Sequence, residues 1–541
     1  MISVLATNIT SPLGFTTEQN YQAALSGASA LKRYLPLKGD ERSWGLSEPF
    51  AASLFSEEQR RELATPGYTF FEALAIRSAK EALTRTQLDA ASPRVVLILS
   101  TTKGNIGETP SEAAQRIAEA IGLTTTPIVV CNACVSGLSA QLLADHLHTA
   151  GFYDYAIVVG AEVQSKFIVS GFQSLKAVSD ESCRPFDIER IGLNPGEAAA
   201  TIIFGRTADK ESWCLLDGAS CNDAFHNVSP SPKAEGCREA IEAVMKSRDK
   251  EKLATVCVHG TATLYNDQME SVAIERTGLS DVPLSALKGY FGHTMGAAGV
   301  LETILTMRAT DDGVVLPSKG FTEVGVSGKV SISSEPQETD KTSFLKIMSG
   351  FGGCNVAALY SKTTDYRRQT TDFKLLKTHT VRLSSKEGKS LTDIYKQEIG
   401  NYPKFYKMDI LSRLAFVAAE LLMKDVEETQ EAPAIILFNH SSSIVSDRQY
   451  LATISDAEGC FPSPSVFTYT LPNITTGEIA IRHHFQGETS FYILPTKDEA
   501  LMSQILKATL LGTGATSVIS GWIDAESETS YECELSEYNI K

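Results

Sequence analysis

Three short runs of the sequence carry side chains that could do chemistry together. They are CNACVSG around Cys134, HGTAT starting at His259, and KGYFGHTMGAAG from Lys288 through His293. These runs supply one thiol, two imidazoles and one ammonium group. A thiol can hold an acyl group as a thioester while two imidazoles stabilise the oxygen of an enolate. The set therefore suits carbon–carbon bond formation on a thioester.

Cys134 stands between an apolar strand pattern and a helix whose apolar residues fall on one face. This order predicts a strand–turn–helix arrangement with the sulfur near the helix N-terminus. Unpaired backbone N–H groups and the positive end of the helix dipole there favour a thiolate, and the same N–H groups can hold an oxyanion. The small residues Gly137, Ser139, Ala140 and Ala144 predict a thin helix that packs closely against another backbone.

Two other interpretations of Cys134 have to be weighed. An isolated cysteine is more often a buried, inert thiol. Cys131 and Cys134 also spell CxxC, which is typical of redox or zinc sites. No second cysteine or histidine pair follows at metal spacing, and Cys131 lies within the predicted strand, so we expect no metal. The two histidine motifs favour a catalytic role for Cys134.

The histidines and the lysine occupy turns of a kind that often carries function. His259 ends the strand pattern TVCVH, and open α/β sheets place catalytic groups at such strand ends. His293 lies in a glycine-flanked turn ahead of an apolar helix. Glu270 could pair with Lys288 and fix its charge near the site. For Glu270 and for Asp267, a solvated helix face is the alternative.

The composition excludes several classes of function. The chain has 541 residues, 43% of them hydrophobic, a mean hydropathy of −0.06 and a formal charge of −16. This charge argues against nucleic acid or an anionic membrane as a partner. The N-terminus does not resemble a signal peptide, and no apolar run approaches the roughly 20 residues of a membrane span. Ten dispersed cysteines do not suggest a disulfide framework, so we expect a cytoplasmic location.

Short apolar strands alternate with longer helical patterns, which indicates an α/β fold with sheets covered on both faces. The predicted strands are Arg94–Ser100, Pro127–Cys131, Tyr155–Ala161, Ala200–Phe204, Thr255–His259, Lys329–Ser333, Ser343–Ser349 and Asn355–Tyr360. The predicted helices are Phe70–Leu83, Val135–His148, Cys237–Met245 and Ala297–Ala309.

The pattern restarts weakly after a polar stretch that follows Tyr360. We interpret Ile410–Asp524 as a degenerate repeat of roughly residues 73–164, with GEIAIRHHFQGE standing where PIVVCNACVSG stood. Anchoring Gly137 on Gly487 puts His484 at the position of Cys134. No thiol falls at that elbow, so we assign this part no chemistry. An unrelated small α/β domain is the alternative.

Taken together, these motifs resemble a β-ketoacyl-acyl carrier protein synthase of the elongating, Cys–His–His kind. The resemblance covers roughly residues 1–362 and includes the opening ITSPLGFTTEQNYQAALSGASAL, the segment RPFDIERIGLNPGEAAATIIF and the closing GFGGCNVAALY. It implies a thiolase-like fold, layered α-β-α-β-α with two mixed five-stranded sheets. A linker at 363–375 and a smaller α/β domain at 376–541, similar to a truncated N-terminal thiolase half, would follow.

The resemblance also implies a role for each motif residue. Cys134 would accept the acyl chain, while His259 and His293 would contact the malonyl thioester carbonyl and stabilise the enolate formed on loss of carbon dioxide. Lys288, held by Glu270, would organise the charge around His293. The remaining implied residues are the backbone N–H groups of Cys134 and Phe351 as the oxyanion hole, the Phe351 ring as a gate, and Thr261 and Thr263 as contacts of the pantetheine arm.

The partners follow from the same family. They are an acyl carrier protein, whose phosphopantetheine carries the acyl and malonyl thioesters, and a second subunit in a homodimer or in a heterodimer with a related synthase or chain-length factor. No other cofactor is implied. SEEQRREL resembles the family's basic docking helix, which makes Arg60 and Arg61 candidates for gripping the carrier protein.

Some features depart from the family pattern and leave other functions open. Leu264 stands where proline is usual and Asn266 where glycine is common. Cys354 leaves room for a thiolase, although His293 disfavours an initiating synthase, which would carry asparagine there. A silent chain-length factor is the non-enzymatic alternative. The C-terminal appendage is similar to synthases of aryl-polyene or flexirubin pigment clusters.

Overall fold

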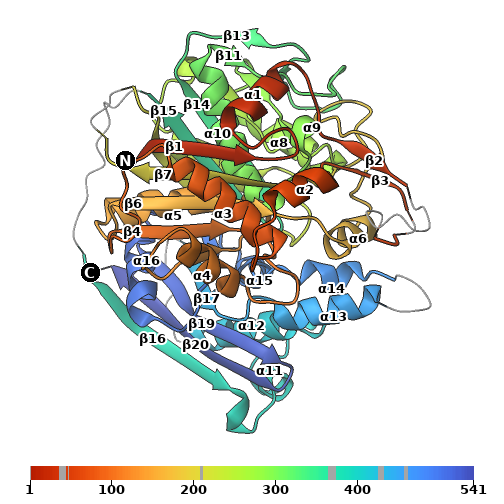
Figure 1. The fold of residues 1–541 in the computed structure, drawn as a ribbon. Coiled ribbons are helices and arrows are strands. Elements are labelled where there is room, and N and C mark those ends of the chain that lie inside the picture. Colours follow the sequence, from red (N-terminus) through yellow and green to blue (C-terminus); the bar gives the residue numbers. More distant parts are fainter. Residues whose placement is uncertain are drawn as a thin grey trace.

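One mixed sheet of 16 strands runs through the whole molecule (Figure 1). The computed structural model describes residues 2–35, 44–46, 48–207, 211–362, 373–424, 432–455 and 461–540. The predicted linker 363–375 lies largely outside these residues, and the strand that follows it already begins at Leu375.

Among the described residues, three five-stranded units with the same topology supply 15 of the 16 strands, and the short strand β12 (Ser331–Ile332) pairs with β10 at one edge of the sheet. The first contains β1 (Ile2–Thr10), β4 (Val95–Ser100), β5 (Ile128–Val130), β6 (Tyr155–Glu162) and β7 (Ala198–Gly205). The second contains β8 (Cys214–Asn222), β9 (Leu253–Cys257), β10 (Pro283–Ser285), β14 (Ser343–Gly350) and β15 (Cys354–Ser361). The third contains β16 (Leu375–Ser384), β17 (Ala434–Asn439), β18 (Thr489–Ile493), β19 (Ser517–Ser527) and β20 (Ser530–Ile540).

Strand order and direction agree in all three units. Across the sheet the orders are β5-β4-β6-β7-β1, β10-β9-β14-β15-β8 and β18-β17-β19-β20-β16. In each order the first three strands are parallel and the last two pair antiparallel. The thiolase-like fold predicted for the first two units is thus confirmed, but their two five-stranded sheets are joined in one continuous sheet, and the C-terminal part repeats the topology of one half.

The first and third units meet edge to edge through equivalent strands. β5 pairs antiparallel with β18, with Val130 opposite Tyr492 and Val129 opposite Ile493. Because each strand holds the same place in its own unit, an approximate two-fold axis relates the two units, as in an isologous dimer interface. The first and second units join instead through β1 and β8, which share two residue pairs.

Helices cover both faces of the sheet and enclose cores shared between units (Figure 1). In the first unit these are α3 (Phe70–Leu83), α4 (Pro110–Ala120) and α5 (Ser136–Thr149), and in the second α7 (Glu235–Met245), α8 (Leu264–Arg276) and α10 (Ala298–Asp311). In the third they are α12 (Ile410–Met423), α13 (Ile444–Ile454), α15 (Ile474–His483) and α16 (Glu499–Thr513). One apolar cluster contains Leu142 of α5 and Ile505 of α16 together, so the third unit shares a core with the first.

Shorter elements carry the loops that surround the sheet. The helices are α1 (Thr17–Leu25), α2 (Glu57–Leu63), α6 (Lys166–Ser174), α9 (Lys288–Phe291), α11 (Leu391–Glu398) and α14 (Pro464–Thr468). The strands are β2 (Lys32–Tyr34) and β3 (Phe50–Ala52), which pair with each other, and β11 (Val314–Val315) and β13 (Gln337–Glu338), which form a second pair. No helix among the described residues has the length and apolar character needed to span a bilayer.

The register predicted for the C-terminal repeat is wrong. The segment GEIAIRHHF is not a strand, because α15 runs through it and His484 caps that helix in a left-handed conformation. The strand equivalent to β5 is β18, which begins after Gly487, and α16 follows it as α5 follows β5. His484 therefore does not occupy the place of Cys134.

Candidate active site

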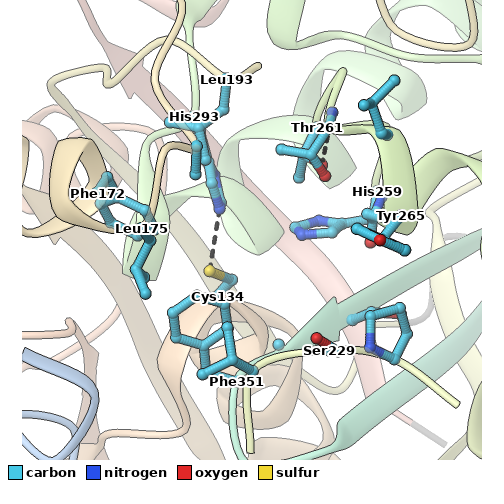
Figure 2. Close-up of a pocket in the computed structure, with 18 of the residues that line it drawn as sticks. Cys134, Phe172, Leu175, Leu193, Ser229, His259, Thr261, Tyr265, His293 and Phe351 are labelled. Carbon is cyan, nitrogen blue, oxygen red and sulfur yellow. Dashed lines mark hydrogen bonds between the residues drawn. The ribbon is translucent and has the colours of Figure 1, made fainter. Parts of the chain in front are cut away.

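A cleft of about 440 Å³ brings the predicted motifs together (Figure 2). Cys134, His259 and His293 all line it, and the rest of its wall also comes from the first two units. The prediction that these three side chains share one cavity is thus confirmed. The third unit contributes no lining residue to the cleft among the described residues.

A strained turn presents the sulfur of Cys134. Ala133 adopts a φ of 48°, a left-handed conformation that is rare outside glycine, and a 3₁₀ turn over Ala133–Val135 leads into α5. Ser136 fixes this turn, since its hydroxyl accepts from the Asn132 N–H and donates to the Ala133 carbonyl. The predicted strand–turn–helix is therefore present.

The helix after Cys134 packs backbone against backbone, as its small residues predict. A Cβ atom added to Gly137 would lie 2.9 Å from the Gly296 carbonyl and 3.0 Å from the Val300 nitrogen. Only glycine permits this approach between α5 and the start of α10. The contact holds the turn of Cys134 against the loop that carries His293.

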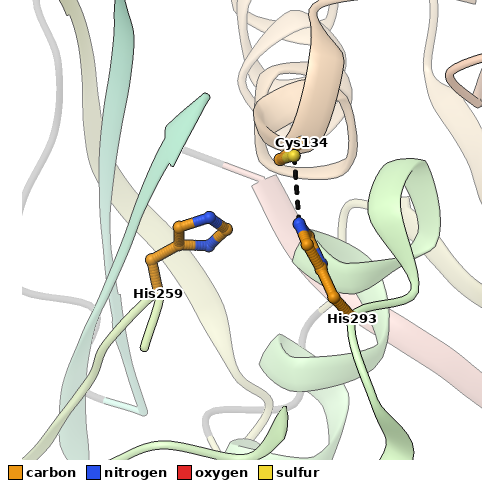
Figure 3. Close-up of side chains that lie close together, drawn as sticks. All are labelled: Cys134, His259 and His293. Carbon is orange, nitrogen blue, oxygen red and sulfur yellow. Dashed lines mark hydrogen bonds between the residues drawn. The ribbon is translucent and has the colours of Figure 1, made fainter. Parts of the chain in front are cut away.

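The sulfur and the two imidazoles converge (Figure 3). Cys134 Sγ lies 3.0 Å from His293 Nε2, and the two imidazole rings are 5.2 Å apart between centroids with an interplanar angle of 80°. One ligand-type atom from each of the three residues lies within 4.8 Å of the others. A substrate carbonyl between them could touch all three groups.

The hydrogen bonds on the far side of each ring fix its tautomer. His293 Nδ1 accepts from the Met295 N–H at 3.3 Å, and His259 Nδ1 lies 3.3 Å from the Lys288 ammonium, which can only donate. A neutral imidazole that accepts at Nδ1 carries its proton on Nε2. Both rings therefore offer an Nε2–H donor, and that of His293 points at Cys134.

Lys288 is paired with Glu302 and not, as the sequence analysis expected, with Glu270. Its ammonium lies 2.8 Å from Glu302 Oε1 and also donates to the His259 carbonyl. Glu302 belongs to α10 and binds a second buried ammonium, that of Lys346, at 2.7 Å. The charge beside the imidazoles is thus organised by a Lys288–Glu302–Lys346 cluster.

Glu270 supports the backbone that carries His259. Its two carboxylate oxygens accept from the N–H groups of His259 and Gly260, and Gly260 has a φ of 51°. Burial raises the pKa of Glu270 to about 7, against these hydrogen bonds. The carboxyl group therefore positions His259 without being an ion-pair partner of Lys288.

Burial and the nearby ammonium groups keep both imidazoles neutral. The pKa values of His259 and His293 lie well below the ordinary value, first because the rings are desolvated and then because Lys288 and Lys346 repel a further positive charge. Although burial would raise the pKa of Glu302, these two ammonium groups hold it below its ordinary value. Glu302 therefore favours its ionised form, while both imidazoles favour their neutral form.

The thiol is less acidic than the helix terminus alone predicts. Burial raises the pKa of Cys134 to about 12, with Lys288 acting in the opposite direction. The Nε2–H of His293 is aimed at the sulfur and also favours the thiolate. Burial and the His293 donor thus act on the acidity of Cys134 in opposite directions.

The loop between β14 and β15 brings Phe351 next to Cys134. A Cβ atom on Gly350 would lie 3.4 Å from the Cys134 nitrogen, and the Phe351 ring packs on Phe172 with centroids 6.0 Å apart. Asn473 of the third unit holds the loop, because its side-chain amide donates to the Phe351 carbonyl at 2.8 Å. The third unit thus supports the predicted gate.

The two predicted pantetheine contacts lie in the cleft wall. Thr261 and Thr263 line the cavity, and their hydroxyl groups are 2.9 Å apart. Leu264 and Asn266, which depart from the family pattern, line the same wall. Leu264 is 58% exposed, so the substitution changes the rim of the cleft and leaves the convergent groups in place.

The two predicted docking arginines differ in their surroundings. Arg60 forms an ion pair with the buried Glu197 and stacks on Phe70, 4.2 Å from the ring centroid. Arg61 is exposed and donates only weakly to the Glu57 carbonyl at 3.3 Å. Arg61 is therefore free to reach a partner, whereas Arg60 is held by the protein itself.

A second, smaller cavity of about 20 Å³ is lined in part by Cys134 and Phe351. Its wall is mostly apolar and is shared between the first unit, through Phe167, Ile168 and Phe172, and the third, through Phe467 and Leu471. The Phe467 ring fills the space beside Gly171, where an added Cβ atom would lie 2.1 Å from it. The third unit thus closes the apolar side of the site.

The residues that support the site from behind were not predicted from the sequence. Glu302 is an acidic residue in an apolar helix, and Lys346 stands in the apolar strand pattern SFLKIMS. Charged residues in such settings are rare unless paired, which is the signal that could have found them. Phe467 and Asn473 gave no signal, because only the pairing of β5 with β18 brings them to the site.

Known protein families match the part of the sequence that carries this geometry. The sequence matches the family models of the beta-ketoacyl synthase N-terminal domain over residues 68–210 and of its C-terminal domain over residues 214–322. These ranges include Cys134, both histidines, Lys288 and Glu302.

Curated relatives share the same part of the chain. A tetracenomycin polyketide synthase ketoacyl synthase alpha subunit from Streptomyces glaucescens is 27% identical over 277 residues, covering 48% of this chain and 65% of the relative. A 3-oxoacyl-[acyl-carrier-protein] synthase 2 from Mycobacterium leprae (strain TN) is 29% identical over 253 residues, covering 43% of this chain and 60% of the relative. The chain thus spans less than two thirds of the length of these relatives.

Solved structures support the fold over different lengths. A ketosynthase (ApeO) in complex with its chain length factor (ApeC) from Xenorhabdus doucetiae gives a TM-score of 0.56 at 22% identity, covering 66% of this chain and 97% of that chain. A structure titled PfaC keto synthase-chain length factor gives a TM-score of 0.80 at 13% identity, covering 99% of this chain and 78% of that chain. The second likeness includes the third unit.

Proposed function

We propose that this chain catalyses decarboxylative Claisen condensation. The match of residues 68–210 and 214–322 to the beta-ketoacyl synthase family models supports this proposal. An acyl group carried as a thioester on Cys134 would react with malonyl-acyl carrier protein and give 3-oxoacyl-acyl carrier protein. The observation that carries the proposal is the convergence of Cys134 Sγ with two imidazoles that both present Nε2–H.

In the first step the sulfur takes the acyl group from its carrier. The thiolate of Cys134 attacks the thioester carbonyl, and the oxyanion that forms accepts from the backbone N–H groups of Cys134 and Phe351. The carrier thiol leaves with a proton, and the acyl chain stays on Cys134. Its apolar tail would lie in the small cavity beside Phe351, which has to widen to receive it.

In the second step the malonyl thioester occupies the open cleft. Loss of carbon dioxide leaves an electron pair on the α-carbon, and the thioester oxygen takes up the charge as an enolate. The Nε2–H groups of His259 and His293 donate to that oxygen, so no strong base is needed. Neutral rings suit this task, since each can donate without first losing a proton.

In the third step the new carbanion attacks the acyl group on Cys134. A carbon–carbon bond forms, the bond to sulfur breaks, and the thiolate returns. The product thioester is longer by two carbons and remains on its carrier. The thiol of Cys134 is thus both the nucleophile of the first step and the leaving group of the third.

The third unit fits the role of the non-catalytic partner subunit. It meets the first unit through equivalent strands, supports the gate through Asn473 and closes the apolar cavity with Phe467. We therefore place the chain-length-factor role in residues 376–541 of the same chain and the chemistry in residues 1–362. A thiolase role is disfavoured, because the Cys354 thiol contacts Thr489 of the third unit at 3.3 Å and not the cleft.

The proposal is tested with malonyl- and acyl-carrier protein as substrates and the Cys134→Ala variant. The wild-type chain should release carbon dioxide and form a 3-oxoacyl thioester, detected by mass spectrometry. The variant should form none. Elongation activity that persists in Cys134→Ala would refute the proposal. Cys131→Ala is the matched control, since the Cys131 thiol donates to the Thr102 carbonyl.

A further inference from the structure

Lys346 is a second ammonium group beneath the active site, fully buried in β14. It donates to the carbonyl groups of Cys257 and Val258, at 3.3 and 3.2 Å, directly before His259 in the chain. It also lies 2.7 Å from Glu302 Oε2. Lys346 therefore touches both the strand that carries His259 and the carboxylate that holds Lys288.

The cluster has an excess of positive charge. Glu302 supplies one negative charge, whereas Lys288 and Lys346 supply two positive charges, and all three side chains are at most 3% exposed. A buried carboxylate needs only one ammonium partner to be neutralised. The second ammonium leaves one net positive charge next to two imidazoles.

We propose that Lys346 is a positioning residue whose charge keeps His259 and His293 in their neutral, hydrogen-bond-donating form. Protonating either ring would add a like charge beside an already positive cluster, which is costly in a desolvated site. The carbonyl contacts of Lys346 also fix the end of β9. This inference rests on the proposed function only for its consequence in catalysis.

Other ionisable groups around the rings are each satisfied by their own contacts. Those that face the imidazoles or line the cleft beside them are Lys288, Lys346, Glu302, Glu270, Asp267, Glu162, Cys134, Asp223 and His226. Asp267 accepts from the Phe186 and Ala262 N–H groups, and Glu162 from those of Thr102 and Gly296. None of these contacts replaces the charge of Lys346.

The direct test follows the titration of the two imidazoles. The full-length protein would be labelled with ¹³C at histidine Cε1 and titrated by NMR, with His259→Ala and His293→Ala variants to assign the signals. In Lys346→Met the cluster loses its excess charge, so both rings should titrate at higher pH by about one unit. Lys346→Arg should leave the titration unchanged.

A double variant separates charge from packing. Lys346→Met combined with Glu302→Gln restores one net positive charge, that of Lys288, and should return the titration toward that of the wild type. If Lys346→Met does not fold, Glu302→Gln alone has two positive charges and should move the titration to lower pH. Lys329→Met is the control, since Lys329 is 67% exposed in an ion pair with Asp281.

Two outcomes overturn the inference. One is an unchanged histidine titration in Lys346→Met, and the other is a shift that the double variant does not reverse. These results are independent of catalysis. A wild-type chain that titrates as expected but releases no carbon dioxide from malonyl-carrier protein would refute the proposed function and leave the role of Lys346 intact.

Discussion

At the scale of single residues, the proposed mechanism relies on hydrogen-bond donors whose protons are placed by contacts behind the rings. Met295 and Lys288 occupy Nδ1 of His293 and His259, and this leaves Nε2–H for the substrate. The sulfur lies 3.0 Å from one of these donors. The same donor can therefore serve the thiolate and, later, the enolate.

The roles of the two imidazole donors and of the Cys134 sulfur should be distinguishable by experiment. Cys134→Ala should still release carbon dioxide from malonyl-carrier protein, because decarboxylation needs only the imidazoles. His259→Ala and His293→Ala should each lower that rate by about 10²- to 10³-fold, the usual cost of one lost donor to an oxyanion. Radiolabelled carbon dioxide release measures both, and equal rates in all three variants would contradict the assignment.

The acidity of the thiol gives a second prediction at this scale. Burial raises the pKa of Cys134 to about 12, so the thiolate fraction should still be increasing above pH 9. Alkylation by iodoacetamide, followed on the Cys134 peptide by mass spectrometry, should therefore accelerate with pH up to pH 10 without a plateau. A plateau near pH 7 would show a preformed thiolate and contradict the expected titration.

The sequence predicted the reacting groups better than the groups that support them. Cys134, His259, His293 and Lys288 each stand in a motif whose turn chemistry is local and therefore readable. The partner of Lys288 is not local, because Glu302 reaches it only after α10 packs beneath the turn. Glu270 is closer to His259 in sequence, yet its carboxylate is taken by backbone N–H groups.

At the scale of elements, the loop between β14 and β15 and the helix α14 define the apolar side of the site. Phe467 of α14 packs on Phe172 with ring centroids 5.3 Å apart, and Phe172 packs on Phe351. These three rings form a continuous path from the gate to the third unit. The space available to an acyl chain depends on this stack.

Shortening Phe467 should therefore lengthen the accepted acyl chain. Phe467→Ala removes the ring that closes the cavity, and each further methylene buried there contributes about 0.8 kcal/mol, or roughly fourfold in affinity. Competition between acyl-carrier proteins of increasing length measures the shift. Phe461→Ala, at a side chain that is 69% exposed, should have no effect, and an unchanged length preference in Phe467→Ala would refute the role of α14.

Element types were predicted well where the periodicity was strong. The helix at Phe70–Leu83 has the expected bounds. The segment GEIAIRHHF was misread because its alternation of apolar and charged residues suits a strand locally. Its helix is stabilised by tertiary packing instead, since Ile479 and Ala480 are fully buried in the core shared with α12.

At the scale of the whole molecule, we propose that the third unit takes the place of a second subunit. β18 covers the edge of β5, so the strand edge that a separate partner would use is already paired. The expectation of a homodimer or heterodimer came from the family. In the proposed function the third unit takes the place of that partner, since β18 already pairs with β5.

The intact chain should therefore be a monomer in solution. Light scattering coupled to gel filtration should give a mass near 58.5 kDa at micromolar concentration, with full condensation activity. The reason is that the exposed edge and the apolar cores of the first unit are already covered. A stable dimer of twice this mass would contradict this account of β18.

A buried ion pair joins the first and third units and provides a test of stability. Lys103 reaches into the third unit, where its ammonium lies 2.7 Å from Asp447, and both side chains are mostly buried. Lys103→Met leaves Asp447 buried and uncompensated, which should cost about 3–5 kcal/mol. In urea denaturation, the double variant Lys103→Met with Asp447→Asn should lose less free energy of unfolding than Lys103→Met alone. Equal losses in the two variants would contradict this coupling.

The repeat within the chain was visible in the sequence, but its register was not. β17 and β19 both begin within Ile410–Asp524, the stretch interpreted as a repeat. β18 was missed because TSFYI is short and follows a helix that was taken for the strand. The antiparallel pairing of β5 and β18 joins residues more than 350 positions apart, which no local pattern reports.

The measurement closest to the central claim is the mass of the Cys134 peptide during a single turnover. Wild-type protein mixed with acyl-carrier protein should show one acyl group on Cys134. Addition of malonyl-carrier protein should remove it as a 3-oxoacyl thioester appears. An acyl group on another residue, or product formed without any on Cys134, would contradict the account.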